Sequence, residues 1–498
     1  MINKKTLEKI VIILILIFGI YLIYSASITP MLGEDEERIV YSKKFINGEI
    51  YPENLSESGQ TLFFYAITGI PSLFFNNYLE ILTLSHIFTA MFTVFLLFII
   101  YFLGKKIENI YFSIVCTLFL LSFPLLFHLS LIAYVDAQIA FFSALIIYSI
   151  IRFDKNKTIE NLIFLSIFSA ISFYFKNSGV LLIFLTFCYL IYEYLKNKNI
   201  KFLLIFILIT SSILLPHVIM NIIKFNYPNM PLLNYFFKYP IKEISWIKEA
   251  TSTLSYAIPS IPFFINTFGF IQFILLIFAF ILILQERKIE YILMLIFIIL
   301  FILLFIESYI FGERILETRY LTIIFPQIAI INAYFVYELI KKKRIIEYFI
   351  VIIIFILLLF SLLNTFNTID LTSKSIRYTP DYIAALKWIK ENTNTYDKIF
   401  TVYAGALKIY GERSSVSIGE EFPELMRGTN STYDYDVLKK YNVSYILIWS
   451  AFVGRDYIIP ESNIIGAFTP TFINTMLQDT KHFEKVFENR ETIIFKLL

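Results

Sequence analysis

Long apolar segments separated by short polar stretches run along most of this chain. About eleven of these segments are close to the roughly 20 apolar residues that a membrane-spanning helix needs. They lie at residues 10–32, 79–103, 110–128, 137–153, 160–175, 178–195, 201–224, 262–284, 290–311, 321–340 and 345–366. The pattern predicts a membrane all-α domain over residues 1–366, built as a polytopic bundle of about 11 helices.

The pattern changes after residue 366, where charges and turn residues separate apolar runs of strand length. Thr379, Pro380 and Asp381 form an N-cap, an N1 proline and a first-turn acid before a segment with helical spacing. The remaining elements alternate between strands at 398–404, 444–450 and 491–498 and a helix at 435–441. Residues 367–498 are therefore predicted to form a small C-terminal α/β domain.

Composition agrees with a membrane protein. The chain is 58% hydrophobic, contains 54 Phe and has a mean hydropathy of +0.72, which is more apolar than a soluble core requires. The net charge of +3 is small, so nothing favours nucleic acid as a partner, and membrane lipids are the expected surroundings. The two cysteines, Cys116 and Cys188, both lie in apolar runs, which excludes a disulfide framework.

Every second loop between the predicted spans is basic, which indicates the orientation of the chain in the cell membrane. The basic residues are Lys4, Lys5 and Lys9; Lys105 and Lys106; Arg152, Lys155 and Lys157; Lys196, Lys198 and Lys201; Arg287 and Lys288; and Lys341, Lys342, Lys343 and Arg344. These loops are expected to face the cytoplasm together with the N-terminus. The C-terminal domain is then expected to be extracytoplasmic.

This orientation places a run of four carboxylates, Glu34 to Glu37, in a first external loop over residues 33–78. The second half of that loop, residues 61–75, is apolar, too short to span, and interrupted by Gly69 and Pro71. We expect it to form a helix at the membrane surface.

Five ionisable residues are predicted to lie at the outer ends of the spans: Asp35, Glu36, Asp136, Lys176 and Arg319. Taken singly, each has an ordinary explanation. The acids are typical of a solvated loop, Asp136 of a helix N-terminus, and the cations of side chains that extend to the interface. Charges near the membrane usually face a cavity or one another, and together the five favour a functional site.

One reaction needs this mixture of charges. Transfer of a sugar from a phosphate-linked lipid to a hydroxyl requires a base for the attacking oxygen, and a carboxylate can serve. The leaving phosphate is weakly basic and needs cations rather than a second, proton-donating carboxylate. Guanidinium and ammonium groups at the outer interface would meet that phosphate.

Several short motifs resemble the GT-C glycosyltransferases, in particular the dolichyl-phosphate-mannose protein mannosyltransferases and the aminoarabinose transferases. The acidic pair Asp35 and Glu36, followed by Tyr41, is similar to the DE motif of that family. The fragments AYVDAQIAFF (133–142), YFKNSG (174–179) and TRYLTIIFP (318–326) resemble its later landmarks, and AALKWIKENT, VYAGALKIYGER and KKYNVSYILIW resemble its C-terminal domains.

The resemblance implies an inverting transferase that takes a sugar from a polyprenyl-phosphate donor. It implies Asp35 as the catalytic base and Glu36 as its partner, although Glu34 or Glu36 could also be the base. It implies Lys176 and Arg319 as contacts to the donor phosphate. Residues that bind the acceptor or position the site would be Asp136, Tyr41 and Tyr320. The His-Pro-Pro segment that is frequent in the first loop of relatives is missing here, and no WWDYG motif occurs, which argues against an oligosaccharyltransferase catalytic subunit.

No cofactor is required by the sequence. A divalent cation could bind through Asp35, Glu36 and Asp136, because carboxylate oxygens are suitable ligands, but no spacing demands one. The sugar and the acceptor, whether lipid, glycan or protein, stay open. Two other classes of protein are alternatives: a transporter or flippase of lipid-linked sugars, and a non-catalytic assembly subunit of a surface glycosylation system.

Overall fold

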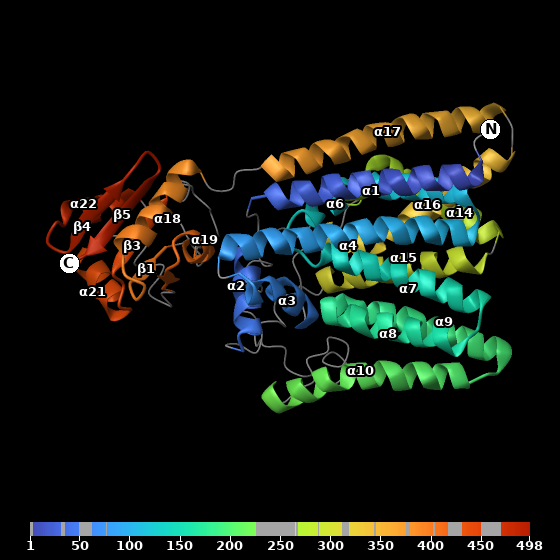
Figure 1. Ribbon diagram of the computed structural model, residues 1–498, viewed down its shortest axis with the longest axis horizontal. Coiled ribbons are helices and arrows are strands. Elements are labelled where there is room, and N and C mark those ends of the chain that lie inside the picture. Colours follow the sequence, from blue (N-terminus) through green and yellow to red (C-terminus); the bar gives the residue numbers. More distant parts are fainter. Residues whose placement is uncertain are drawn as a thin grey trace. The chain divides into compact units, whose positions relative to one another are not determined.

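The computed structural model describes residues 3–30, 35–48, 62–75, 77–225, 264, 267–286, 288–310, 318–342, 345–374, 379–401, 404–416, 431–449 and 470–498 (Figure 1). The chain divides into two compact units. The larger contains Met1–Pro30, Tyr41–Asn76 and Glu80–Ser375, and the smaller contains Met31–Val40, Asn77–Leu79 and Ile376–Leu498.

Long helices form the larger unit, and each predicted span corresponds to a helix or a broken helix (Figure 1). They are α1 (Lys4–Ile28), α4 (Tyr78–Ile107), α5 (Ile110–Leu121), α6 (Pro124–Ser130), α7 (Asp136–Lys155), α8 (Ile159–Phe175), α9 (Val180–Asn197), α10 (Lys201–Phe225), α14 (Phe270–Glu286), α15 (Ile289–Ile310), α16 (Phe325–Lys342) and α17 (Ile345–Lys374).

Among the described residues, seven helices are long and apolar enough to cross a membrane, and the bent pair α5 and α6 counts as an eighth. Three shorter apolar helices, Ile159–Phe175, Phe270–Glu286 and Glu290–Leu303, match the remaining predicted spans. The segment predicted as a span at 110–128 forms a bent pair of helices, because the chain turns by 71° between α5 and α6. The last helix also continues to Lys374, beyond its predicted end at residue 366.

The first external loop of the prediction contributes α2 (Asp35–Ile46), α3 (Leu62–Gly69) and the 3-10 helix η2 (Ile70–Leu73). Within the larger unit, the Ser42 Oγ and Thr68 Oγ1 atoms are 2.5 Å apart, and Ser85 Oγ donates to the Thr68 carbonyl at 3.1 Å. A Cβ atom at Gly69 would lie 2.6 Å from the Ser42 carbonyl oxygen, so only glycine permits this packing. Serine and threonine side chains thus join α2, α3 and α4, and Gly69 permits the close approach of α2 and α3.

Apolar side chains of η2 and the turn that follows it are exposed, with Leu73 at 64% and Phe74 at 76%. The predicted helix at 61–75 is therefore present in its described part, from Leu62 onward, as the α-helix α3 followed after Gly69 by the 3-10 helix η2. Its position at the membrane surface stays a prediction. The exposed apolar side chains of Leu73 and Phe74 favour that position.

The basic loops of the larger unit lie at one end of the bundle, which we call the basic end. Lys105 pairs with Glu8, and Lys155 donates to the carbonyl of Lys106. Lys157 pairs with Glu193 near the end of α9. These contacts connect the N-terminus of α1, the α4–α5 and α7–α8 loops, and the end of α9.

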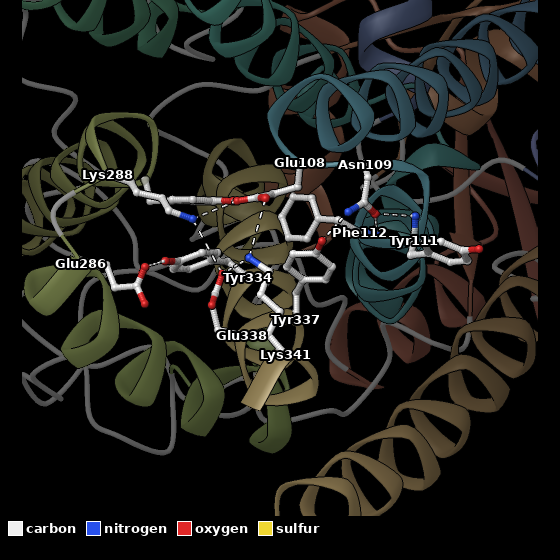
Figure 2. A network of polar contacts seen from close by, with 11 residues as sticks. Glu108, Asn109, Tyr111, Phe112, Glu286, Lys288, Tyr334, Tyr337, Glu338 and Lys341 are labelled. Carbon is white, nitrogen blue, oxygen red and sulfur yellow. Dashed lines mark hydrogen bonds and ion pairs between the residues drawn. The ribbon is translucent and has the colours of Figure 1, made fainter. Parts of the chain in front are cut away.

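A second group of contacts adds the α14–α15 loop and α16 to the basic end (Figure 2). Lys288 Nζ lies 3.0 Å from Glu108 Oε1 and 3.7 Å from Glu338 Oε1. Lys341 Nζ lies 2.6 Å from Glu338 Oε1. Lys288 Nζ also lies 4.9 Å from the ring centre of Tyr334. The alternation of basic and non-basic loops in the sequence therefore corresponds to two ends of one helical unit.

The smaller unit contains a five-stranded sheet in the order β2-β1-β3-β5-β4. Its strands are β1 (Lys398–Phe400), β2 (Ser414–Ser415), β3 (Tyr445–Trp449), β4 (Phe483–Glu488) and β5 (Thr492–Leu497), and its helices are α18 (Pro380–Asn392), α19 (Ala404–Tyr410), α21 (Ser431–Lys440) and α22 (Pro470–Gln478). The first three strands in this order are parallel, and β5 runs antiparallel to β3 and β4.

The predicted α/β class of this unit is confirmed, as are three strands and the helices at 380 and 435. Thr379 caps α18 through its Oγ1, which accepts from the Tyr382 amide at 3.3 Å. The strand predicted at 398–404 was too long, since it ends at Phe400 and α19 begins at Ala404. Sequence patterns missed β2, β4, α19 and α22. The two strands were missed because two-residue strands and edge strands with alternating charge have weak apolar periodicity.

Asp479 and His482 connect the end of α22 to β4. Asp479 Oδ2 lies 2.7 Å from His482 Nδ1, and this hydrogen bond is the main cause that lowers the pKa of the Asp479 carboxyl from its ordinary value of 3.8. A lowered folded-state pKa stabilises the fold above the unfolded pKa, and this contribution disappears as the pH falls through the folded value.

We expect Asp479→Asn to lower the protection of residues 470–498 against hydrogen exchange at pH 6 by about 0.5 kcal/mol, as for a single ion pair near the protein surface. The difference from wild type should vanish well below pH 3.8. Exchange is measured by mass spectrometry on the full-length protein. A difference that is equal at both pH values would show that the carboxylate charge contributes nothing.

Candidate active site

A buried ion pair forms the centre of the candidate site. Asp136 is the first residue of α7, and Lys176 follows the last residue of α8. Lys176 Nζ lies 2.6 Å from Asp136 Oδ1, and the two side chains are only 7% and 2% exposed. Because α7 ends and α8 begins at the basic end, this pair lies at the opposite end of the larger unit.

The local backbone explains why Lys176 turns inward. Lys176 adopts an extended conformation and ends α8, and the Gly179 amide donates to the Lys176 carbonyl at 2.8 Å. A Cβ atom at Gly179 would lie 2.4 Å from the Ser172 carbonyl oxygen. The glycine of the YFKNSG fragment is therefore required for the chain to fold back onto α8 and to hold the lysine beside Asp136.

Arg319 and Tyr320 lie on η4 (Thr318–Ile324), the 3-10 helix that precedes α16. The Arg319 guanidinium carbon lies 4.8 Å from the ring centre of Tyr134 and 5.4 Å from that of Tyr320. Lys176 Nζ lies 4.7 Å from the ring centre of Tyr320. One tyrosine ring thus lies against both cations, and such contacts stabilise a cation that has lost part of its water.

Thr322 connects η4 to α7. Its Oγ1 donates to the Arg319 carbonyl at 2.8 Å and lies 3.5 Å from the Asp136 carbonyl oxygen. We use the name outer cluster for Asp136, Lys176, Arg319, Tyr320 and Tyr134. It combines two cations with one carboxylate, so its net charge is positive and suits an anionic ligand such as a phosphate.

The structure therefore brings together four of the residues singled out by sequence: Asp136, Lys176, Arg319 and Tyr320. Asp35 is the first residue of α2, and Glu36 and Tyr41 lie on the same helix, but the side chains of these three lie outside the described part of the structure. Asp35 and Glu36 fall in the smaller unit and the outer cluster in the larger one. Their participation in a common site stays a prediction.

Sequence reasoning did not single out Tyr134 or Thr322 as site residues. Both lie within fragments that the family resemblance marks, two residues before Asp136 and three residues after Arg319. The only sequence signal for these two residues was their closeness to Asp136 and Arg319 within those fragments. Among the described residues, no group of three or more His, Cys, Asp or Glu could hold a metal ion. The side chains of Asp35 and Glu36 are not among the described ones, so this observation does not test a metal site that includes them.

The sequence matches no family profile and no curated protein, but the fold is similar to solved structures. ArnT from Cupriavidus metallidurans in the apo state has a TM-score of 0.65 and 12% identity over 97% of both chains. The same protein bound to undecaprenyl phosphate has a TM-score of 0.61 and 11% identity.

The archaeal oligosaccharyltransferase AglB from Archaeoglobus fulgidus, in complex with an inhibitory peptide and a dolichol-phosphate, has a TM-score of 0.55 and 14% identity over 79% of this chain. This chain spans 62% of that structure's length. Together these similarities define a GT-C-like membrane fold with a small C-terminal sheet domain and confirm the predicted fold class. At such low identity they show the fold alone.

We expect the Asp136–Lys176 pair to behave as a buried pair in a double-mutant cycle. Asp136→Asn or Lys176→Met alone should cost about 3–5 kcal/mol, because each leaves one buried charge without its counterion. The double variant should cost clearly less than the sum of the two. The free energy of unfolding is measured in lipid bicelles.

The control is the exposed pair of Lys374 and Asp370 on α17, where Lys374→Ala should leave the free energy of unfolding unchanged within the error of the measurement. Strict additivity of the Asp136 and Lys176 substitutions would mean that the two charges do not depend on each other.

Proposed function

We propose that this protein is a membrane glycosyltransferase. It moves a sugar from a polyprenyl-phosphate-linked donor to an acceptor hydroxyl or similar nucleophile on the outer face of the membrane, in a single inverting displacement. The observation that carries the proposal is the outer cluster, a net positive group at the non-basic end of a GT-C-like helical unit. The undecaprenyl phosphate bound to ArnT and the dolichol-phosphate in complex with AglB support the donor class.

The reaction needs one proton transfer and one substitution. Asp35 takes the proton from the acceptor hydroxyl, with Glu36 as its partner, while the acceptor oxygen bonds to the anomeric carbon of the sugar. The bond from that carbon to the phosphate oxygen breaks at the same time, and its electrons leave with the polyprenyl phosphate. Attack from the side opposite the phosphate inverts the configuration.

Arg319 is the main contact to the donor phosphate in this proposal. A guanidinium that stacks on tyrosine rings keeps its N–H donors in its own plane, where a phosphate can accept from them in a bidentate manner. Lys176 adds a second positive charge that Asp136 partly neutralises. Tyr320 positions both cations, because its ring lies against each of them.

The two alternative classes fit the helices less well. A transporter or flippase usually binds its substrate near the midplane, between broken helices, whereas Asp136 and Lys176 lie at helix ends. A non-catalytic assembly subunit does not need a buried ion pair beside a second cation. Formation of product from the donor separates the proposed function from both.

The first test is sugar transfer by the purified protein in proteoliposomes that contain a radiolabelled polyprenyl-phosphate sugar and a mixture of peptide, lipid and glycan acceptors. We expect wild type to form product and Asp35→Asn to lose a factor of about 100–10,000 in rate, as for a general base. Asp35→Asn must fold as wild type by size-exclusion chromatography and thermal unfolding. Full activity in this variant would refute Asp35 as the base.

A second test addresses the donor phosphate. Arg319→Ala should raise the KM for the donor about 10- to 100-fold, as expected for the loss of a charged hydrogen bond. The control is Arg152→Ala, because Arg152 makes a comparable contact with the Phe164 ring, 5.9 Å away, at the basic end. If both substitutions changed the KM for the donor equally, Arg319 would not be a specific contact to the donor phosphate.

A further inference from the structure

The break between α5 and α6 lies upstream of the outer cluster. α5 ends at Leu121, and Pro124 begins α6 with no backbone N–H and with Phe123 in an extended conformation. Carbonyl groups released at such a break need new partners, because an apolar interior offers no water. We call Ser122 and Phe123 the helix break.

Side chains of two other helices bond to carbonyl groups at the break. The Phe119 carbonyl accepts from the Ser122 amide at 3.2 Å and from Ser122 Oγ at 2.7 Å, and it also accepts from Gln272 Nε2 on α14 at 3.1 Å. The Ser122 carbonyl accepts from Ser361 Oγ on α17 at 2.8 Å. Gln272 Nε2 also contacts the Ser122 hydroxyl. Ser122 and Gln272 are buried, so these bonds replace solvation that the protein interior excludes.

Asn332 on α16 fixes the orientation of Gln272. Its Nδ2 donates to Gln272 Oε1 at 2.6 Å and to the Gln272 carbonyl at 3.0 Å. Because the Oε1 atom accepts from Asn332, the Nε2 donor of Gln272 is directed to the helix break. A line of amides therefore runs from α16 through α14 to α5.

The helix break determines where the following segment goes. α6 has seven residues and bends by 71° from α5, so a straight continuation would move its far end by on the order of 10 Å. That end leads through the buried residues Leu131 to Val135 directly to Asp136. Tyr134, which lies against Arg319, belongs to the same segment.

We propose that Gln272 and Asn332 are positioning residues for the outer cluster. They hold the helix break and thereby place Tyr134 against Arg319 and Asp136 against Lys176. The kinetic consequence rests on the proposed function, whereas the structural consequence does not, and the two are tested separately.

The kinetic test compares Gln272→Leu and the milder Asn332→Ala with Thr117→Val. Thr117 is the matched control, because it is a buried residue of α5 whose hydroxyl bonds within its own helix, to the Ser113 carbonyl at 2.9 Å. Gln272→Leu should raise the KM for the donor about tenfold and Asn332→Ala less, with the KM for the acceptor changed by no more than about twofold. If a variant only reduced the fraction of folded protein, the maximal rate would fall but the KM values for donor and acceptor would both stay unchanged.

The structural test uses a thiol at the end of α6. Ser130 is buried there, and Ser130→Cys is introduced after Cys116→Ala and Cys188→Ala remove the two native thiols. Maleimide should label this cysteine about tenfold faster in the Gln272→Leu background than with Gln272 intact, because the loss of the hydrogen bonds permits opening. Thr117→Val should leave the labelling rate unchanged.

Unchanged labelling in the Gln272→Leu background would overturn the inference, as would an unchanged KM for the donor, or an equal effect of Thr117→Val. If wild type transfers no sugar, the proposed function fails. In that case the labelling rate alone decides whether Gln272 holds the helix break.

Discussion

Polar groups inside an apolar helical bundle need partners within the protein, and this constraint explains most of the larger unit. The helix break at Ser122 is stabilised because Gln272 and Ser361 donate hydrogen bonds to the Phe119 and Ser122 carbonyls. The buried charge of Lys176 is stabilised because Asp136 Oδ1 lies 2.6 Å from its Nζ. In both places a deviation from a regular helix is compensated by a side chain from a distant part of the sequence.

The constraint also separates two kinds of charged contact. At the basic end, lysines and glutamates that are partly exposed join neighbouring loops, and their individual contributions to stability are small. At the opposite end, the Asp136–Lys176 pair is buried and lies beside tyrosine rings. A single unit thus combines partly exposed ion pairs, which connect its helices, with a buried pair at its other end.

Sequence patterns predicted the helical unit well, because hydrophobic length and alternating basic loops are strong signals that depend only on neighbouring residues. They also indicated Asp136, Lys176, Arg319 and Tyr320, which the structure brings together. Contacts between residues far apart in the sequence could not be predicted from local patterns. The bond between Asn332 and Gln272 and the direct pairing of Asp136 with Lys176 depend on tertiary packing, and Pro124 was the one local sign of the helix break.

The short elements of the smaller unit were the hardest to predict. β2 has two residues and its pairing partner is a parallel strand before it in the sequence, so no local pattern distinguishes it from a loop. The acidic residues Asp35 and Glu36 were singled out by their place after the first predicted span, and the family resemblance supplied their expected roles. Their place on α2 agrees with a helical start rich in carboxylates, which a helix N-terminus favours.

The length of α4 relates these features to the thickness of a bilayer. α4 has 30 residues and is therefore about 45 Å long, whereas the hydrocarbon layer measures about 30 Å. From Lys105, at the basic end, about 30 Å of helix leads back to Ser85, the residue that holds α3 through the Thr68 carbonyl. If the lysines lie at one headgroup layer, α3 and the exposed side chains of Leu73 and Phe74 lie at the other. A membrane thinner or thicker than this distance would displace α3 from the level of the headgroups, so we expect the protein to be sensitive to the acyl-chain length of the surrounding lipids.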